Sequence, residues 1–382
     1  MIFLRRRRAD KDVRVPPKMY DLIIIGAGPA GISAAYEAKK AGLSHLVIEK
    51  GLIGNTIYDY PVGLTVFSTT NELEFSHGDL KPAREKPTRE ELLSYYVRFV
   101  LDNELNVQTE ETVLSVTTGS EPPASAGGTN AGIDQAEFDG GVRDETVQSS
   151  VPEVVPPAYA GGSDSFVVTT NKGEYVAKNI LFAIGAMDYP RKLNVPGEDL
   201  PHVFDHFKET YPWVKKKALI VGGGNSAGEA ALFLAQEGAE TTLAIFRADW
   251  ENTDPKQGCI KYWVKQPLEE ELGGHCLNLF FLGKVIEIRP GEIELENENG
   301  DRVTMANDVV FVLIGSDADL SMMKDLGVAT EQGKYGEVPV YDAEKFETNV
   351  PGVYVAGHFT NQRHIKGAID GGKAAVTAMV KE

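Results

Sequence analysis

The chain begins its ordered pattern with a short apolar run that passes through a glycine-rich turn into an alanine-rich helical segment. Residues 22–25 form the apolar run, residues 32–41 form the helical pattern, and Gly42 marks its end. A second apolar run follows at residues 46–49. This order predicts a strand, a helix and a parallel strand, which is the opening of a βαβ unit.

The same order recurs in the second half of the chain. Residues 218–221 form an apolar run, three glycines follow, and an alanine-rich helical pattern extends to Gln236 before Gly238. The next apolar run covers residues 241–246. Later apolar runs predict four strands and a closing helix, at residues 277–281, 284–288, 309–314, 353–356 and 362–380. Two such openings predict two nucleotide-binding domains, each a three-layer α/β fold.

Between the two units the sequence predicts one more helix and an insertion. Residues 88–103 have a helical pattern in which Thr88 takes the N-cap position and Glu91 the capping-box position. Residues 117–165 are rich in glycine, serine, alanine, proline and acidic residues without apolar periodicity, which favours a flexible surface insertion. Strands are expected after it, at residues 165–170 and 175–184.

Size and composition indicate a globular protein with two domains. The chain has 382 residues, of which 42% are hydrophobic and 25% charged. A formal net charge of −18 argues against nucleic acid as the main partner, because phosphate binding relies on Lys and Arg. No apolar run reaches the length of a membrane span. We therefore expect no membrane and no metal among the partners.

The arginines near the start and the two cysteines add two expectations. Residues 1–18 contain four consecutive arginines but no apolar stretch of signal-peptide length, which favours a disordered leader; an anchor for anionic surfaces is the alternative. The only cysteines are Cys259 and Cys276, which do not form a CxxC pair. Such low cysteine usage favours a reducing, cytoplasmic location.

The first glycine-rich turn carries a dinucleotide-binding motif, with Gly26, Gly28 and Gly31 in the spacing GxGxxG. The first glycine permits the tight turn, the second leaves room for a pyrophosphate, and the third lets the helix pack closely on the strand. The N-terminus of that helix offers N–H groups and a positive dipole end to phosphates. Glu49, at the end of the next strand, is placed to accept hydrogen bonds from the adenosine ribose.

The second glycine-rich turn repeats the motif as GxGxxA, with Gly222, Gly224 and Ala227. The residues around it extend the predicted nicotinamide dinucleotide site: Gly223, Asn225, Ser226 and Glu229. An acidic residue at the end of the following strand would select the 2′-hydroxyl of NADH, but Arg247 stands there, and its guanidinium suits the 2′-phosphate of NADPH. An exposed arginine that caps the strand is the alternative.

A segment near the C-terminus identifies the cofactor expected at the first site. Residues 352–357 return as a strand and a glycine before a helix, which suits FAD, a cofactor too long for one βαβ unit. We predict an FAD domain of residues 19–200 and 335–382, with the NAD(P) domain, residues 201–334, inserted in it. Hinges are expected near residues 197–202 and 333–339. Two such sites in one chain indicate hydride transfer from NADPH to FAD.

With these motifs the chain resembles the thioredoxin reductase-like flavoproteins over nearly its whole length. The residues that carry this resemblance are 182–185, 196–198, 222–229 and 352–357, with Arg363, Ala368 and Gly372. A narrower resemblance, to the bacillithiol disulfide reductases that lack a CxxC pair, rests on residues 55–61, 66–69, 86–89, 95–96 and 260–264. The resemblance implies a homodimer that uses FAD and NADPH to reduce a disulfide or related group on a small redox acceptor or small redox protein.

The resemblance also implies contacts to FAD beyond the glycine motif. The residues expected to make them are Pro29, Ala30, Asn55, Gly185, Gly357, His358, Arg363, His364 and Ala368. The N-terminus of the final helix, around residues 361–364, is expected to stabilise negative charge on the flavin ring.

The sequence departs from this family at three places. No cysteine stands between residues 198 and 222, where thioredoxin reductases carry their dithiol. Ala30 takes the place of the cysteine proposed as important in the bacillithiol branch. His358 takes the place of an aspartate that contacts the ribityl chain, and it is either a replacement hydrogen-bonding group or an ordinary loop residue.

The candidate catalytic residues are Cys259, His202 and His206. Each has a plain alternative, an unreactive thiol or an ordinary loop histidine. The missing dithiol leaves two other functions open. One is reduction of ferredoxin or flavodoxin by NADPH, which needs no cysteine, and the other is a non-catalytic flavin- or nucleotide-binding redox sensor.

Overall fold

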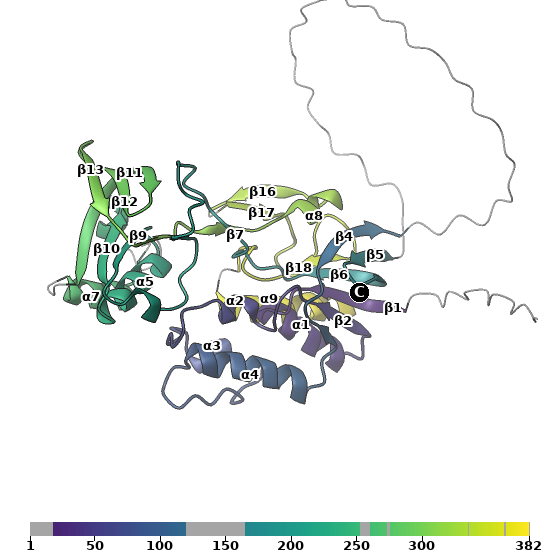
Figure 1. Ribbon diagram of the computed structural model, residues 1–382. Helices are drawn as coiled ribbons and strands as arrows, with labels where there is room; N and C mark the ends of the chain where they lie inside the picture. The colour runs from purple at the N-terminus through teal and green to yellow at the C-terminus, as the bar shows by residue number, and fades with distance from the viewer. Residues whose placement is uncertain are drawn as a thin grey trace, which may run out of the picture.

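The computed structural model describes residues 18–119, 165–252, 260–272, 276–334, 336–362 and 364–381. These residues form two seven-stranded sheets with helices packed against them, and two small two-stranded sheets (Figure 1). Almost all of the expected leader and most of the expected insertion lie outside the described residues. No helix in the described part of the chain is long and apolar enough to cross a membrane.

The first sheet combines strands from both ends of the chain. Its order is β3-β2-β1-β6-β5-β4, and β18 pairs with β6. The strands are β1 (Met19–Ile25), β2 (His45–Ile48), β3 (Val107–Gln108), β4 (Val113–Thr118), β5 (Phe166–Thr170), β6 (Glu174–Phe182) and β18 (Val353–Val355). β18 runs parallel to β6, with Val353 beside Ile180. The first sheet is therefore interrupted in sequence, in agreement with the predicted insertion of one domain in the other.

The central strand β1 is buried on both faces, as expected for a strand in a parallel sheet. Leu22 and Ile24 face the side covered by α1 (Pro29–Lys40) and α9 (Ile365–Lys381). Ile23 and Ile25 face the opposite side, which is covered by α8 (Ser321–Asp325) and the segments around it. The alternation of a strand thus fixes both layers around the first glycine turn.

Helices α1 and α9 approach each other closely because their contact is made of small residues. A Cβ atom on Gly372 would lie only 2.2 Å from the carbonyl oxygen of Ala30. Ala34 and Ala35 in α1 have no exposed surface. This contact brings the C-terminal helix beside the first glycine turn.

The predicted capping box is confirmed. Helix α4 (Arg89–Asp102) has Thr88 as N-cap. The Thr88 hydroxyl accepts a hydrogen bond from the Glu91 N–H at 3.2 Å, and a Glu91 carboxylate oxygen accepts one from the Thr88 N–H at 2.9 Å. Two short helices, α2 (Asn55–Tyr58) and α3 (Thr70–Leu73), precede α4.

The second sheet has the order β13-β12-β11-β10-β9-β14-β8. Its strands are β8 (Val203–Phe204), β9 (Lys217–Val221), β10 (Glu240–Ile245), β11 (Leu277–Arg289), β12 (Glu292–Asn297), β13 (Arg302–Ala306) and β14 (Val309–Val312). Its helices are α5 (Asn225–Gln236), α6 (Arg247–Glu251) and α7 (Tyr262–Glu271), with the 3-10 turn η1 (Tyr211–Trp213). β9, β10, β14 and the start of β11 are parallel, so this sheet carries the second βαβ unit.

The prediction of two separate strands at residues 277–281 and 284–288 is wrong, because one strand, β11, covers both. The register with β12 shifts between Leu282 and Lys284, and a Cβ on Gly283 would lie 2.5 Å from the carbonyl oxygen of Asn297. The break in the apolar pattern is thus a β-bulge at a glycine. The hairpin of β12 and β13 was not expected from the sequence.

The remaining elements lie between the two large sheets and around α8. They are β7 (Tyr189–Pro190), β15 (Ser316–Asp317), β16 (Thr330–Gly333) and β17 (Gly336–Pro339). Leu320, Met323 and Val328 lie in the core of the first sheet, although the predicted second domain extends to residue 334. The domain bounds stay a prediction, and this packing favours a second crossing closer to Gly315.

Candidate functional site

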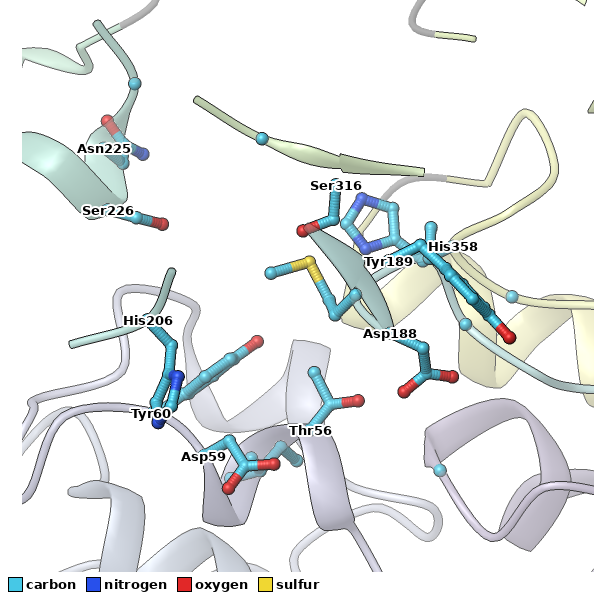
Figure 2. A pocket seen from close by; sticks show the side chains of 18 of the residues that line it. Thr56, Asp59, Tyr60, Asp188, Tyr189, His206, Asn225, Ser226, Ser316 and His358 are labelled. Carbon is cyan, nitrogen blue, oxygen red and sulfur yellow. The ribbon is translucent and has the colours of Figure 1, made fainter. Parts of the chain in front are cut away.

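One cavity of about 2150 Å³ joins the two glycine-rich turns. Residues of the first sheet, the second sheet and the C-terminal helix line it, and Figure 2 shows Asn225 and Ser226 on one side of it with Thr56 and His358 across from them. In each open parallel sheet the glycine turn follows the carboxyl end of a strand, which is where such sheets bind ligands. The two predicted cofactor sites therefore share one space.

The first turn has the shape that a pyrophosphate cradle requires. Gly26 has φ of +108°, and a Cβ there would lie 2.5 Å from the carbonyl oxygen of Ala183. A Cβ on Gly31 would lie 1.9 Å from the carbonyl oxygen of Gly26, so only glycine lets α1 start this close to the strand. Gly28 has open space where a Cβ would be. The three glycines thus fit the three roles expected of them.

Glu49 holds the first turn in place. One of its carboxylate oxygens accepts a hydrogen bond from the Ala27 N–H at 2.7 Å, and the other accepts one from the Gly51 N–H at 2.8 Å. The side chain is buried yet borders the cavity. Each oxygen retains a further lone pair, so contact with a ribose remains compatible with these bonds and stays a prediction.

The predicted FAD residues gather around this turn. Those that line the cavity are Gly26, Gly28, Pro29, Ala30, Glu49, Asn55, Gly185, Gly357, His358, His364 and Ala368. Gly357 has φ of +112° and lies against α1, where its Cβ would be 3.4 Å from that of Ala30. Arg363 lies outside the described residues. The strand, glycine and helix at the C-terminus therefore complete the cradle, although direct contacts to FAD stay predictions.

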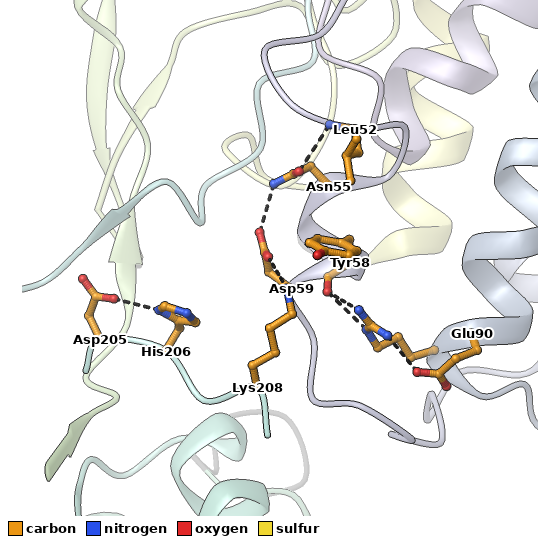
Figure 3. A network of polar contacts seen from close by, with 9 residues as sticks. Leu52, Asn55, Tyr58, Asp59, Glu90, Asp205, His206 and Lys208 are labelled. Atoms are coloured by element: carbon orange, nitrogen blue, oxygen red, sulfur yellow. Dashed lines mark hydrogen bonds and ion pairs between the residues drawn. The ribbon is translucent and has the colours of Figure 1, made fainter. Parts of the chain in front are cut away.

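Asn55 belongs to a polar network that continues toward the second sheet (Figure 3). Its side-chain oxygen accepts a hydrogen bond from the Leu52 N–H, and its amide group donates to Asp59 at 2.9 Å. Asp59 in turn pairs with Lys208 at 3.3 Å. Asn55 thus orders the cavity wall, and through Asp59 and Lys208 it begins a connection between the two parts of the molecule.

The second turn has the same construction with alanine as its third small residue. Gly222 has φ of +154°, and a Cβ there would lie 2.3 Å from the carbonyl oxygen of Leu313. Gly224 has open space at its Cβ position. Ala227 is buried at the start of α5. The members of this predicted site that line the cavity are Gly222, Gly223, Gly224, Asn225, Ser226 and Glu229.

Glu229 is the most perturbed carboxyl group in the cavity. Burial raises its pKa to about 7. Burial also raises the pKa of Tyr60, and the nearby Glu229 carboxylate adds to this effect. Tyr60 follows α2 and Glu229 lies in α5, so these two groups interact electrostatically across the cavity. Perturbed pKa values of this kind are common at functional sites.

Arg247 is held by carboxylates rather than aimed into the cavity. Its guanidinium forms a two-pronged hydrogen-bonded pair with Glu298, donates to Glu251 at 3.2 Å and lies 3.7 Å from the ring centroid of Phe281. The hydrogen bonds to Glu298 raise its pKa above the ordinary value. Arg247 starts α6 beside the carboxyl end of β10. Its predicted contact with a 2′-phosphate stays a prediction.

Of the three catalytic candidates, the structure describes only the two histidines, and only one of them borders the cavity. His206 lines the cavity and lies 3.0 Å from the Asp205 carboxylate. His202 does not line it, and its buried Nε2 atom has no hydrogen-bond partner among the residues that the structure describes. Cys259 lies outside the described residues. Cys276 packs against the core of the second sheet and does not border the cavity.

Several cavity residues were missed by sequence reasoning. Thr56 projects from α2 and Tyr60 from the loop after it. Asp188 and Tyr189 follow the carboxyl end of β6 (Figure 2). Asp188 pairs with Lys50 at 2.8 Å. The place of Asp188 just after a central strand is the signal that could have identified it, since loops at that edge of a parallel sheet carry the site.

Comparison with known proteins identifies the family. The pyridine nucleotide-disulphide oxidoreductase family matches residues 23–122 and 151–357. The chain belongs to this family. It is therefore a flavin-dependent NAD(P)H oxidoreductase, and the family implies that it binds FAD and NAD(P)H.

Individual relatives indicate which branch of the family the chain resembles. The chain is 31% identical over 335 residues to the bacilliredoxin reductase Bdr of Bacillus subtilis, covering 88% of each chain. It is 26% identical over 346 residues to a ferredoxin–NADP reductase of Ignicoccus hospitalis, covering 90% of each. The solved bacillithiol disulfide reductase Bdr of Staphylococcus aureus matches with a TM-score of 0.78 at 28% identity, covering 95% of this chain and 99% of the other. The predicted resemblance to the bacillithiol branch is thus confirmed.

Proposed function

We propose that the protein oxidises NADPH and passes its electrons through FAD to a disulfide of a small redox protein or low-molecular-weight thiol. The observation that carries this proposal is the shared cavity, into which both pyrophosphate cradles open. Bound FAD would accept hydride from the nicotinamide when their rings meet there. Similarity to the bacilliredoxin reductase of Bacillus subtilis supports a disulfide as the acceptor.

The residues of the chain have defined tasks in this proposal. The glycine turns and the N-termini of α1 and α5 hold the two pyrophosphates. Glu229 and Tyr60 stand where the two walls face each other and orient polar groups of the nicotinamide. NADPH and one proton from solvent supply the two electrons and two protons that convert one S–S bond into two thiols.

The proposed route differs from that of thioredoxin reductases because no CxxC pair exists in the sequence. Ala30 lines the cavity at the first turn, where the bacillithiol branch is expected to carry a cysteine. The acceptor disulfide must therefore approach the flavin itself.

Anaerobic stopped-flow mixing tests the first half of the proposal. Purified flavin-loaded protein should lose its visible flavin absorbance within seconds of mixing with NADPH. Subsequent addition of an oxidised bacilliredoxin or of bacillithiol disulfide should restore the absorbance and release thiols in a ratio of two per NADPH. Persistence of the oxidised flavin spectrum after NADPH addition would exclude the function.

Reduction of ferredoxin is the second candidate, and the absence of a cysteine at position 30 favours it. The relative from Ignicoccus hospitalis bears that activity in its name. Variants Cys259→Ser and Cys276→Ser, assayed beside the wild type with ferredoxin and with the disulfides, separate the two functions. Ferredoxin reduction that equals or exceeds disulfide reduction, and is unchanged in both variants, would assign the protein to this second function.

A further inference from the structure

A short segment of the first domain, residues 58–67, contacts the second domain at two places. At the first, Lys208 places its ammonium group 3.3 Å from the Asp59 carboxylate and 3.6 Å from the centroid of the Tyr58 ring. The carbonyl oxygen of Lys208 also accepts a hydrogen bond from the Val62 N–H at 2.9 Å. Figure 3 shows Lys208 reaching toward Asp59 from the segment that also carries Asp205 and His206.

The second place is an aromatic stack across the two domains. The rings of Phe67 and Trp263 are parallel within 8°, with their centroids 3.3 Å apart. The ammonium group of Lys86 lies 3.8 Å from the centroid of Phe67. Because the indole covers one face of the Phe67 ring, the ammonium group covers the other. Phe67 is thus held between a side chain of each domain, in the wall of the cavity.

Trp263 is in turn tied to the second glycine turn. It lies in the first turn of α7, and the N–H of Lys261 just before this helix donates to the Asn225 side chain at 2.8 Å. Helix α7 also packs closely on α5, where a Cβ on Gly228 would lie 2.9 Å from Val264. Any shift of the turn that holds the nicotinamide dinucleotide therefore moves the indole.

We propose that Phe67 is a positioning residue for hydride transfer, which through its stack on Trp263 fixes the separation of the two cofactor cradles. This inference rests on the proposed function. Exposed ion pairs such as Asp59 with Lys208 contribute little, whereas an aromatic pair contributes free energy beyond that of the area it buries. A misplacement of the reacting groups by about 1 Å can cost about a hundredfold in rate.

The stack itself can be tested without measuring activity. The sequence has three tryptophans, so the double variant Trp213→Phe, Trp250→Phe leaves Trp263 as the only one. In that background, Phe67→Ala should raise the acrylamide quenching constant of Trp263 at least twofold, whereas Phe67→Tyr should leave it unchanged. Equal quenching in the presence and absence of the Phe67 ring would overturn the proposal.

The positioning role is tested by flavin reduction under anaerobic stopped flow. Phe67→Ala should slow the reduction at saturating NADPH between tenfold and a hundredfold while the concentration for half-maximal rate changes less than threefold. Phe67→Tyr should retain the wild-type rate. Tyr211→Ala is the matched control, because Tyr211 is an exposed aromatic residue outside the cavity. The double variant Phe67→Ala, Trp263→Ala should be no slower than the slower single variant, because each single substitution already removes the same ring contact.

The outcomes separate this inference from the proposed function. Wild-type protein that is not reduced by NADPH contradicts the proposed function. Wild-type protein that is reduced, together with Phe67→Ala reduced at the same rate, contradicts the positioning role alone. Should Phe67→Ala lose flavin or unfold, Phe67→Leu and Trp263→Leu serve in its place, because a leucine retains more of the side-chain volume than an alanine.

Discussion

The environment of a single carboxyl group, that of Glu229, makes the stability of the protein depend on pH. Its ordinary pKa of 4.5 is raised to about 7 by burial at the start of α5. The folded state therefore binds the proton more tightly than the unfolded state. Consequently the free energy of unfolding falls as pH rises from about 4.5 to 7, and it levels off above that range.

The variant Glu229→Gln removes the titratable carboxyl group and tests this dependence of stability on pH. At pH 8 the variant should be more stable than the wild type by about 1 to 2 kcal/mol, because the glutamine carries no buried charge. At pH 5, where Glu229 is protonated, the two proteins should unfold at the same urea concentration. Urea unfolding at pH 5 and pH 8 measures both values, and a difference that does not depend on pH would contradict the assignment.

Arg247 leads to a prediction about coenzyme choice. Its guanidinium is already turned to a defined orientation by Glu298 and Glu251. If it binds the 2′-phosphate, Arg247→Glu should raise KM for NADPH at least tenfold more than KM for NADH, since the new carboxylate repels a phosphate dianion. Glu298→Gln is the companion variant and should lower KM for NADPH, because it releases the guanidinium from a competing carboxylate. Equal changes for both coenzymes would show that Arg247 only caps the sheet.

At the scale of single residues, the sequence was sufficient where the constraint on a residue comes from its neighbours in the chain. Gly26, Gly31 and Gly222 could be identified because the backbone at a strand–helix turn excludes a Cβ. The pairing of Arg247 with Glu298 could not, because 51 residues separate the partners. Tyr60 was missed for the same reason, since only the folded chain brings it to Glu229.

At the scale of elements, the first glycine turn and its helix permit a matched pair of variants. A Cβ on Gly31 would meet the Gly26 carbonyl oxygen at 1.9 Å, whereas a Cβ on Gly28 would meet nothing within 4 Å. Gly31→Ala should therefore push α1 away from β1 and cost about 2 kcal/mol or more of stability. Gly28→Ala should leave the flavin-free protein as stable as the wild type while weakening FAD binding at least tenfold, because the methyl group enters the space of the pyrophosphate.

Thermal unfolding of the flavin-free proteins and titration with FAD distinguish the two variants. Loss of stability in Gly28→Ala, or unchanged stability in Gly31→Ala, would contradict the roles assigned to these glycines. Helices α1, α4, α5 and α9 and the parallel strands β1, β2, β9, β10 and β14 were predictable from apolar periodicity, whereas the shorter helices and α7 were not. The β11 bulge was not, because Gly283 interrupts the apolar run. The β12–β13 hairpin was missed although its first strand alternates apolar with charged residues and Asn299-Gly300 follows it, which together are a hairpin signal.

At the scale of the molecule, the order of the strands shows why the domain plan could be predicted. The return of a strand and a glycine at residues 352–357 implied that the end of the chain rejoins the first sheet, and β18 does so beside β6. The bounds were harder to predict, because α8 has no pattern that assigns it to either sheet. Its place is set by Leu320 and Met323, which join a core cluster that also contains residues of β5 and β6.

This plan predicts that FAD stabilises the two ends of the chain together. The cradle is formed by α1 near the N-terminus and α9 at the C-terminus, which contact each other where Gly372 meets Ala30. FAD at about a hundred times its Kd should raise the free energy of unfolding by about 2.7 kcal/mol, and its removal should lower Tm by about 5 to 10 °C. Amide hydrogen exchange should then accelerate in α1, α9 and β18 together, while the β12–β13 hairpin, which does not border the cavity, serves as the internal control. Acceleration in α1 without α9 would mean that the C-terminal helix docks independently of the cofactor.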